Sequence, residues 1–297
     1  MTPREMGFLL LTSYLGNPER CPLTTAQLRT LSKRVAAVDR ERRQGELEER
    51  DLLNLGFGRD MARRILALLN DRELLEIYLR RGARSGCTPV TRVSRDYPVS
   101  VRNRLGLDAP GCLWARGDLS LLSLPGVSLV GSRDIRPENL VFAREVGRQA
   151  ARQGFVLVSG NARGADQAAQ ESCLAAGGQV ISVVADELER HPLRENVLFL
   201  SEDGFDLPFS SHRALSRNRL IHCMGLRTFV AQCAHRRGGT WDGTVKNLRS
   251  GWSLVYCFAD GSPAVCELQE QGAELIGIDD LHNISSLTTR FFDIFDQ

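Results

Sequence analysis

The feature that most constrains the fold is a regular alternation, between residues 127 and 258, of short apolar runs and longer helical stretches. The helical stretches are about 12 to 18 residues long, which is typical of βα units that wind a parallel sheet. The pattern therefore predicts a Rossmann-like α/β fold with a doubly wound, mostly parallel sheet. The predicted strands are Val127–Val130, Phe155–Val158, Val180–Val184, Thr228–Ala231 and Leu254–Phe258.

Helical periodicity dominates residues 1–82. Thr2-Pro3 predicts the start of a first helix, and Thr24-Thr25 predicts the cap of a second helix that runs toward Val38. The segment from Leu55 to Ile65 is similar to a helix-hairpin-helix turn, whose glycines can offer N–H groups to a phosphate; a plain turn between two helices remains the alternative. We therefore expect an N-terminal helical domain of the SAM or helix-hairpin-helix type.

Residues 83–100 are rich in Gly, Ser, Thr and Pro, and they predict a linker between two domains. The helical domain is expected to cover residues 1–88. The Rossmann-like domain is expected to cover residues 89–297 and to end in an acidic tail.

The formal net charge of +2 hides an uneven distribution. Residues 1–88 carry 16 basic and 12 acidic side chains, residues 89–258 carry 21 and 16, and residues 259–297 carry 1 and 8. The excess of basic side chains in residues 1–258 is compatible with an anionic ligand. The acidic segment that follows is equally compatible with a plain solvent-exposed surface. Lys33 and Lys246 are the two lysines, so the other 36 basic residues are arginines. Arginine suits bidentate phosphate contacts, but genomic base composition explains such a skew more simply.

Composition also excludes several classes of protein. The chain is 42% hydrophobic and 25% charged, and no apolar run approaches the roughly 20 residues of a membrane helix. The N-terminus lacks the pattern of a secretion signal, so we expect a cytoplasmic protein without a membrane association. The eight cysteines form no CxxC or CxxH pair, which argues against zinc and disulfides and for buried thiols. We therefore expect no metal and no cofactor.

Two predicted strand-to-helix turns carry glycine beside polar or charged side chains, which is the composition of an anion site. The glycine permits close approach of the backbone, and the N–H groups of the next helix point at the ligand. An ordinary strand-to-helix turn without a ligand can have the same residue composition, so this alternative remains. Asp166 is expected to cap its helix, with a contact to a ribose as the alternative. The candidate residues are Gly131, Ser132 and Arg133 in the first turn, and Ser159, Gly160, Arg163, Gly164 and Asp166 in the second.

The order and spacing of several segments resemble the DprA/Smf family of DNA-processing proteins over roughly residues 96–258. These segments are VSLVGSRD, then GFVLVSGNARGADQAAQESCLAAGGQVISVV, then LSEDGFDLPF, then ALSRNRLIHCMGLRTFV. The resemblance implies a protein that binds single-stranded DNA and assists loading of the RecA recombinase, rather than an enzyme. We also expect a homodimer.

Arginines in the last of these segments are candidate DNA contacts. At helical pitch, Arg217 and Arg219 diverge by about 200°, so one is expected to reach the ligand while the other packs or pairs. Arg213 and Arg217 share a face and could form a short basic track; a solvated face is the alternative. The candidates here are Arg213, Arg217, Asn218 and Arg219.

A third glycine-rich turn is predicted after the fourth of the predicted strands, and it gives another phosphate cradle. Its candidate residues are Gly238, Gly239, Thr240 and Thr244. The "lonely guy" nucleotide hydrolases place a similar element here and follow it with a catalytic glutamate, where this chain has Val245 and Lys246. Asp242 is expected to cap the helix or to bond the turn.

The sequence also departs from the family pattern. Gln170 stands where the family usually has a histidine, Gln232 where it usually has a glutamate, and Gly238-Gly239-Thr240 in place of its SGS-type turn. Residues 259–297 are too short and too acidic for the winged helix that many members carry. We therefore expect a divergent member that binds single-stranded DNA. The alternatives are a nucleotide-binding sensor, for example in anti-phage defence, and a nucleotide hydrolase that would use Glu202, Asp166 or His235.

Overall fold

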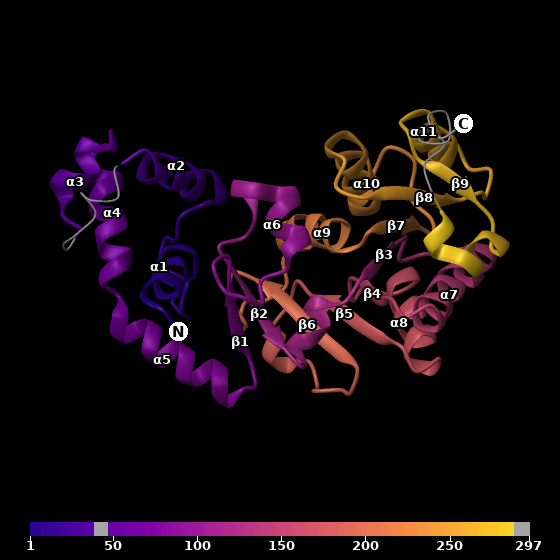
Figure 1. Cartoon of the computed structure of the whole chain (residues 1–297), viewed down its shortest axis with the longest axis horizontal. Coiled ribbons are helices and arrows are strands. Elements are labelled where there is room, and N and C mark those ends of the chain that lie inside the picture. Colours follow the sequence, from indigo (N-terminus) through magenta and orange to yellow (C-terminus); the bar gives the residue numbers. More distant parts are fainter. Residues whose placement is uncertain (39–46, 288–297) are drawn as a thin grey trace.

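A nine-stranded sheet forms the centre of the computed structural model, which describes residues 1–38 and 47–287 (Figure 1). The strand order is β1-β2-β6-β5-β4-β3-β7-β8-β9, and β2 runs antiparallel to both of its neighbours. All other paired strands are parallel, which confirms the predicted α/β class. The strands are β1 (Thr88–Thr91), β2 (Cys112–Arg116), β3 (Gly126–Val130), β4 (Val156–Ser159), β5 (Gln179–Val183), β6 (Val197–Glu202), β7 (Arg227–Val230), β8 (Leu254–Phe258) and β9 (Glu274–Ile276).

The chain reverses its direction of winding between β3 and β7. From β3 it proceeds through β4 and β5 to β6 on one side, and then returns to place β7 on the other side of β3. In open α/β sheets such a reversal opens a crevice at the carboxyl ends of the strands. The crevice here is therefore flanked by the turns that follow β3 and β7.

Helices cover both faces of the sheet, which is why its central strands are buried on both faces rather than on alternate residues. Helices α7 and α8 pack on one face, and α6, α9, α10 and α11 pack on the other (Figure 1). These helices are α6 (Val99–Leu105), α7 (Pro137–Arg152), α8 (Ala165–Ala175), α9 (Ser211–Met224), α10 (Gly238–Ser250) and α11 (Pro263–Glu270).

In residues 1–38 and 47–87, five α-helices precede the sheet, and the two predicted helix starts are confirmed. Thr2 and Thr24 each form a capping box, with Glu5 and Gln27 as the reciprocal partners, because each hydroxyl satisfies an otherwise unpaired N–H group. A turn at Gly56, whose φ is +82°, joins α3 to α4. A DNA contact at this turn stays a prediction. The helices are α1 (Pro3–Thr12), α2 (Thr25–Ala36), α3 (Glu49–Asn54), α4 (Arg59–Asn70) and α5 (Arg72–Arg84).

The helical segment packs directly against the edge of the sheet. Tyr78 on α5 lies 5.2 Å from Trp114 on β2 and 4.5 Å from Phe205, measured between ring centroids. The Tyr78 hydroxyl also donates to Asp206 at 2.5 Å. The hydrophobic core is thus continuous from α1 and α5 into the sheet.

Two expectations about the ends of the sheet were wrong. Residues 83–100 are not a linker, because they contain the end of α5 and the edge strand β1. Residues 259–287 are not a tail, because α11 packs on the sheet and β9 extends it beside β8. The rest of the predicted tail, residues 288–297, lies outside the described residues.

Two further features bear on the class of protein. None of the helices in residues 1–38 and 47–287 combines the length and the apolar composition of a membrane-spanning segment. Six of the eight cysteines are buried, as expected, whereas Cys21 and Cys266 are exposed.

Candidate functional site

A pocket of about 400 Å³ opens at the point where the strand order reverses. We call it the switch-point pocket. Segments from the turns after β3, β4 and β7 and from one side of α9 line it, so the structure brings together the three turns that the sequence singled out. The predicted residues that line it are Gly131, Ser132, Arg133, Asp166, Arg217, Asn218, Gly238, Gly239 and Thr240.

The glycines in these turns are required by close packing. A side chain at position 131 would overlap the Cβ atom of Ala165, the first residue of α8. Gly164 has φ +81°, and a Cβ atom there would overlap the carbonyl oxygens of Ser132 and Arg133. The first two turns therefore pack against each other, and glycine is what permits it.

Of the helices that begin here, α10 presents the freest N-terminus. In the first turn of α8, the N–H of Ala165 donates to the Ser132 carbonyl at 3.2 Å, and ahead of α7 the N–H of Arg136 donates to the Gln232 side chain at 2.8 Å. The first N–H groups of α10, from Gly238 onward, have no partner within their own helix. Together with the helix dipole, they favour an anion in the pocket.

Arg217 is the most unusual side chain of the pocket. Its side chain is 11% exposed, yet no hydrogen bond joins its guanidinium to any other described residue. Its nearest charged partner is Asp166, at 3.9 Å between Nη2 and Oδ2. A buried guanidinium normally has acceptors for most of its five N–H groups. These unsatisfied donors therefore point to an anionic ligand that completes the site.

Asp166 supports Arg217 instead of capping its helix, so the expected cap was wrong. The N-cap residue of α8 is Gly164, and the Asp166 carboxylate accepts from the backbone N–H of Ala162 at 3.4 Å. Burial raises the pKa of Asp166, and the charge of Arg217 acts against that rise. Gly160 makes room for the pair, because a Cβ atom there would overlap both the guanidinium and the carboxylate.

Several side chains around the pocket were not predicted. Arg237 lines it beside Arg133, both are exposed, and neither guanidinium forms a hydrogen bond or an ion pair with the described residues. Phe209 and Leu215 also line it and are 54% and 53% exposed. Arg237 directly precedes the predicted Gly-Gly pair, and this adjacency was a signal that could have identified it. Phe209 lies in an irregular segment, and no periodicity marks it.

Three candidate residues have contacts within the described chain, and a ligand contact at each of them stays a prediction. The fully buried Ser159 donates its hydroxyl to the Leu129 carbonyl at 2.8 Å. Arg213 donates to the carbonyls of Ala185 and Leu207 at 2.8 Å. Thr244 is fully buried within α10.

The third turn also differs from its prediction. Helix α10 begins at Gly238, so this segment is the first two turns of a helix rather than a loop. Asp242 is therefore an exposed helical residue and lies outside the switch-point pocket. The Thr240 hydroxyl donates to the Gly131 carbonyl at 3.1 Å and joins the first and third turns.

The divergence of Arg217 and Arg219 is confirmed. Arg219 turns away from the pocket and donates to Glu202 at 3.2 Å and to the Asp108 carbonyl at 2.9 Å. Asn218 donates to the Gly239 carbonyl at 3.1 Å, which joins α9 to α10. The exposed Arg163 lies in the second turn but does not line the pocket.

Two of the departures from the family pattern have a structural account. Gln170 donates its amide to the Gly160 carbonyl and to the Ser182 hydroxyl. Gln232 donates to the Asp134 carbonyl at 3.2 Å and accepts from the N–H of Arg136. Both glutamines thus hold the turns of the pocket through uncharged hydrogen bonds.

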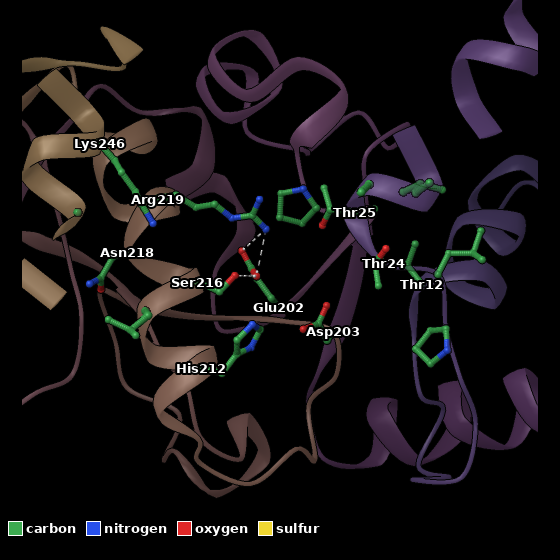
Figure 2. A pocket seen from close by; sticks show the side chains of 18 of the residues that line it. Thr12, Thr24, Thr25, Glu202, Asp203, His212, Ser216, Asn218, Arg219 and Lys246 are labelled. Atoms are coloured by element: carbon green, nitrogen blue, oxygen red, sulfur yellow. Dashed lines mark hydrogen bonds and ion pairs between the residues drawn. The ribbon is translucent and has the colours of Figure 1, made fainter. Parts of the chain in front are cut away.

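A larger hollow of about 680 Å³ adjoins the switch-point pocket. It lies between α2 on one side and α9 and α10 on the other (Figure 2), and we call it the α2–α9 cleft. Leu215, Asn218 and Gly239 line both hollows, so the two are continuous across the ridge formed by α9 and α10.

Asp203 is strained and poorly solvated at the floor of this cleft. Its φ is +69°, a region that residues other than glycine rarely adopt. Burial, and then the neighbouring Glu202, raise the pKa of Asp203 from 3.8 to about 6. The charged carboxylate is therefore unfavourable in the folded protein near neutral pH.

We expect Asp203→Asn to stabilise the protein above about pH 6 by about 2 kcal/mol. The pKa of Asp203 is higher in the folded protein than in the unfolded chain, so the stability of the wild type falls as the pH rises from about 4 to 6. Asparagine stays neutral over this range and also tolerates a positive φ. Urea unfolding of both proteins at several pH values checks this. The gain should vanish below about pH 4, and Asp242→Asn, an exposed carboxylate in the same cleft, should give none. A pH-independent gain would contradict the account.

Comparison with known proteins places the chain in a family. Residues 88–276 match the model of the family described as DNA recombination-mediator protein A. The DNA processing protein DprA of Streptococcus pneumoniae is 31% identical over 183 residues, which cover 57% of this chain and 64% of the relative. DprA of Bacillus subtilis is 26% identical over 164 residues, covering 52% and 54%. The chain thus aligns with about half to two thirds of the length of these curated relatives.

Solved structures show the same fold. The X-ray structure of DprA from Streptococcus pneumoniae matches 97% of this chain and 99% of its own, with a TM-score of 0.71 and 23% identity. A DprA structure from Helicobacter pylori, described in terms of that protein's single-stranded DNA binding mode, matches 66% of this chain and 94% of its own. Its TM-score is 0.57 at 24% identity. The chain belongs to the DNA recombination-mediator protein A family.

Proposed function

We propose that this protein binds single-stranded DNA through the switch-point pocket. The observation that carries the proposal is the buried Arg217 guanidinium, which lines the pocket and has no hydrogen-bond acceptor among the described residues. A DNA phosphate supplies the missing oxygens, because its geometry matches the planar fork of arginine. The Helicobacter pylori relative is described as having a single-stranded DNA binding mode, which supports the same ligand class here.

The surroundings of Arg217 suit a phosphate backbone. The N-terminus of α10 directs its unpaired N–H groups into the pocket, and Arg133 and Arg237 lie at the rim. These two exposed arginines have no ion-pair partner in the described parts of the chain, so their charge is available to adjacent phosphates. A binding site of this kind attracts several phosphates in sequence rather than one.

The apolar rim favours a single strand over a duplex. Phe209 and Leu215 present exposed apolar surface next to the phosphate donors. Unpaired bases can stack on such side chains, whereas the bases of a duplex are stacked on each other.

We infer that the pocket serves binding and not catalysis. Asp166 is the carboxylate that lines it within residues 1–38 and 47–287, and this carboxylate is buried beside Arg217. Glu202 is engaged by Arg219, and His235 lies 2.6 Å from Glu267, so neither faces the pocket. Hydrolysis of a glycosidic bond needs a carboxylate that reaches the bond or the attacking water.

The remaining expectations extend this proposal. We propose that residues 1–88 and 89–297 act as two domains with a shared core, and that the protein works in the cytoplasm in DNA uptake and recombination. A homodimer and assistance to RecA loading follow from the same family resemblance. Each is testable by sedimentation and by a RecA strand-exchange assay.

We expect Arg133→Ala to weaken binding of a fluorescein-labelled single strand by about 10- to 100-fold. This factor corresponds to the loss of one hydrogen bond between charged groups. The melting temperature should change little, because Arg133 is exposed and its guanidinium forms no hydrogen bond or ion pair with the described residues. Fluorescence anisotropy and thermal unfolding measure the two effects. Arg144→Ala, an exposed arginine on α7 that lines neither hollow, is the matched control. Normal binding by the Arg133 variant would show that the pocket is wrongly assigned.

A further inference from the structure

The α2–α9 cleft has a polar wall on each side and a floor of carboxylates (Figure 2). Lys246 of α10 and Asn218 of α9 lie on one side, and Thr24 and Thr25 lie on the other. Glu202, at the end of β6, lies between the two walls with Asp203 (Figure 2). The volume of the cleft, about 680 Å³, is large enough for a nucleotide, and its lining is that of a surface that contacts water or a polar ligand.

Lys246 provides an available positive charge in this cleft. It is exposed and lines the hollow, and neither a hydrogen bond nor an ion pair joins its ammonium to the rest of the described chain. Asp242 lies one helical turn away on α10 without forming an ion pair with it at 4.0 Å or less in the structure. Arg219, the other cation of the cleft, is engaged by Glu202. Lys246 is therefore the group that can receive an anionic ligand.

The carboxylates on the floor do not exclude an anionic ligand, because their charge is largely offset. Arg219 lies 3.2 Å from Glu202, and the Ser216 hydroxyl donates to the same carboxylate at 3.2 Å. Arg213 and Arg219 also act on Asp203 through their charge. Carboxylates are acceptors for the exocyclic amino groups of nucleobases, so the floor suits bases and the Lys246 wall suits phosphates.

Continuity with the switch-point pocket determines what ligand fits. The two hollows share Leu215, Asn218 and Gly239, so a chain molecule in one can pass directly into the other. Leu215 is exposed at this passage and offers an apolar surface between the two groups of phosphate donors. A free mononucleotide would fill one hollow, whereas a single strand of DNA occupies both.

We propose that the α2–α9 cleft is a second DNA subsite, into which a strand held at the switch-point pocket continues, with a phosphate at Lys246 and bases toward the Glu202 and Asp203 floor. This inference rests on the proposed function. It makes the helical segment part of the binding surface, because α2 forms one wall. A second subsite also implies a minimum length of DNA for full affinity, because a short oligonucleotide occupies the switch-point pocket alone.

The presence of two lysines in the chain allows a direct test on the wild-type protein. The full chain is acetylated with a limiting amount of an N-hydroxysuccinimide ester, alone and with a saturating mixed-sequence dodecanucleotide, and each lysine is quantified by peptide mass spectrometry. Lys33, exposed on α2 and outside both hollows, is the internal control. We expect bound DNA to reduce the acetylation of Lys246 about tenfold, because a bound phosphate covers its ammonium group. The acetylation of Lys33 should not change.

Affinity measurements separate this inference from the proposed function. Lys246→Ala should weaken dodecanucleotide binding about tenfold, lower the salt dependence by about 0.7 in the log–log slope, and leave tetranucleotide binding unchanged. Lys33→Ala should change neither. If both oligonucleotides bind but Lys246 is unprotected and its variant normal, the second subsite is wrong while the proposed function stands. Equal protection of both lysines would also overturn the subsite. If no oligonucleotide binds, both proposals fail.

Discussion

Arg217→Ala is expected to abolish most of the DNA affinity, with a loss of about 100-fold or more, because it removes the buried charged contact at the centre of the pocket. It is also expected to lower the free energy of unfolding by about 3 kcal/mol. The physical reason for the second effect is Asp166, whose carboxylate is 7% exposed and would lose its opposing charge. Urea unfolding and fluorescence anisotropy measure the two losses.

A double variant separates the two effects of Arg217. Asp166→Asn removes the buried charge that Arg217 opposes, so the pair Arg217→Ala with Asp166→Asn should recover most of the stability. Binding should remain as weak as in the single variant, because no guanidinium is present to receive the phosphate. If binding returned together with stability, Arg217 would be a structural residue and the proposed contact would be wrong.

Arg20→Ala is expected to lower the free energy of unfolding by about 3 to 5 kcal/mol. Arg20 is buried between α1, α4 and the loop before α2, and its side chain is 4% exposed. It pairs with Asp71 at 2.8 Å and donates to the carbonyls of Leu10 and Leu68 at 2.5 and 3.0 Å. Alanine would leave these buried carbonyls without a donor. Urea unfolding measures the loss.

Arg50→Ala is the matched control for Arg20. Arg50 also has an ion pair, with Glu48 at 3.0 Å, but its side chain is 76% exposed. Exposed pairs contribute about 0 to 1 kcal/mol, so this variant should unfold almost as the wild type does. Equal losses in the two variants would contradict the view that burial makes the Arg20 contacts strong.

The parts of the fold that a local sequence pattern marks could be predicted from the sequence. The runs around Val127, Val156, Val180, Thr228 and Leu254 form strands that are buried along most of their length, because both faces of the sheet are covered. Strands β1, β2, β6 and β9 were not predicted. Strands β1 and β2 form an antiparallel edge outside the βα alternation, and β9 has three residues. Their assignment depends on pairing partners that a single sequence does not show.

The features of the candidate site that follow from residue spacing alone could be predicted from the sequence. Glycines at strand ends predicted the convergence of three turns, and helical pitch predicted that Arg217 and Arg219 diverge. The sequence could not tell that Arg213 binds carbonyls or that Ser159 is buried, because both facts depend on loops brought in from elsewhere in the chain. Arginine is chemically suited to both roles, and only tertiary contacts distinguish a structural guanidinium from an available one.

On the proposed function, the backbone of single-stranded DNA lies in the switch-point pocket. The most direct test is filter binding of the pure protein to a single strand, the corresponding duplex and free mononucleotides across a range of salt. We expect the single strand to bind most tightly. For a strand short enough to occupy the switch-point pocket alone, the log–log salt slope should be about −2, because Arg133, Arg217 and Arg237 each neutralise one phosphate and each phosphate contributes about −0.7. Equal binding of the duplex, affinity independent of salt, or tighter binding of a mononucleotide would contradict the account.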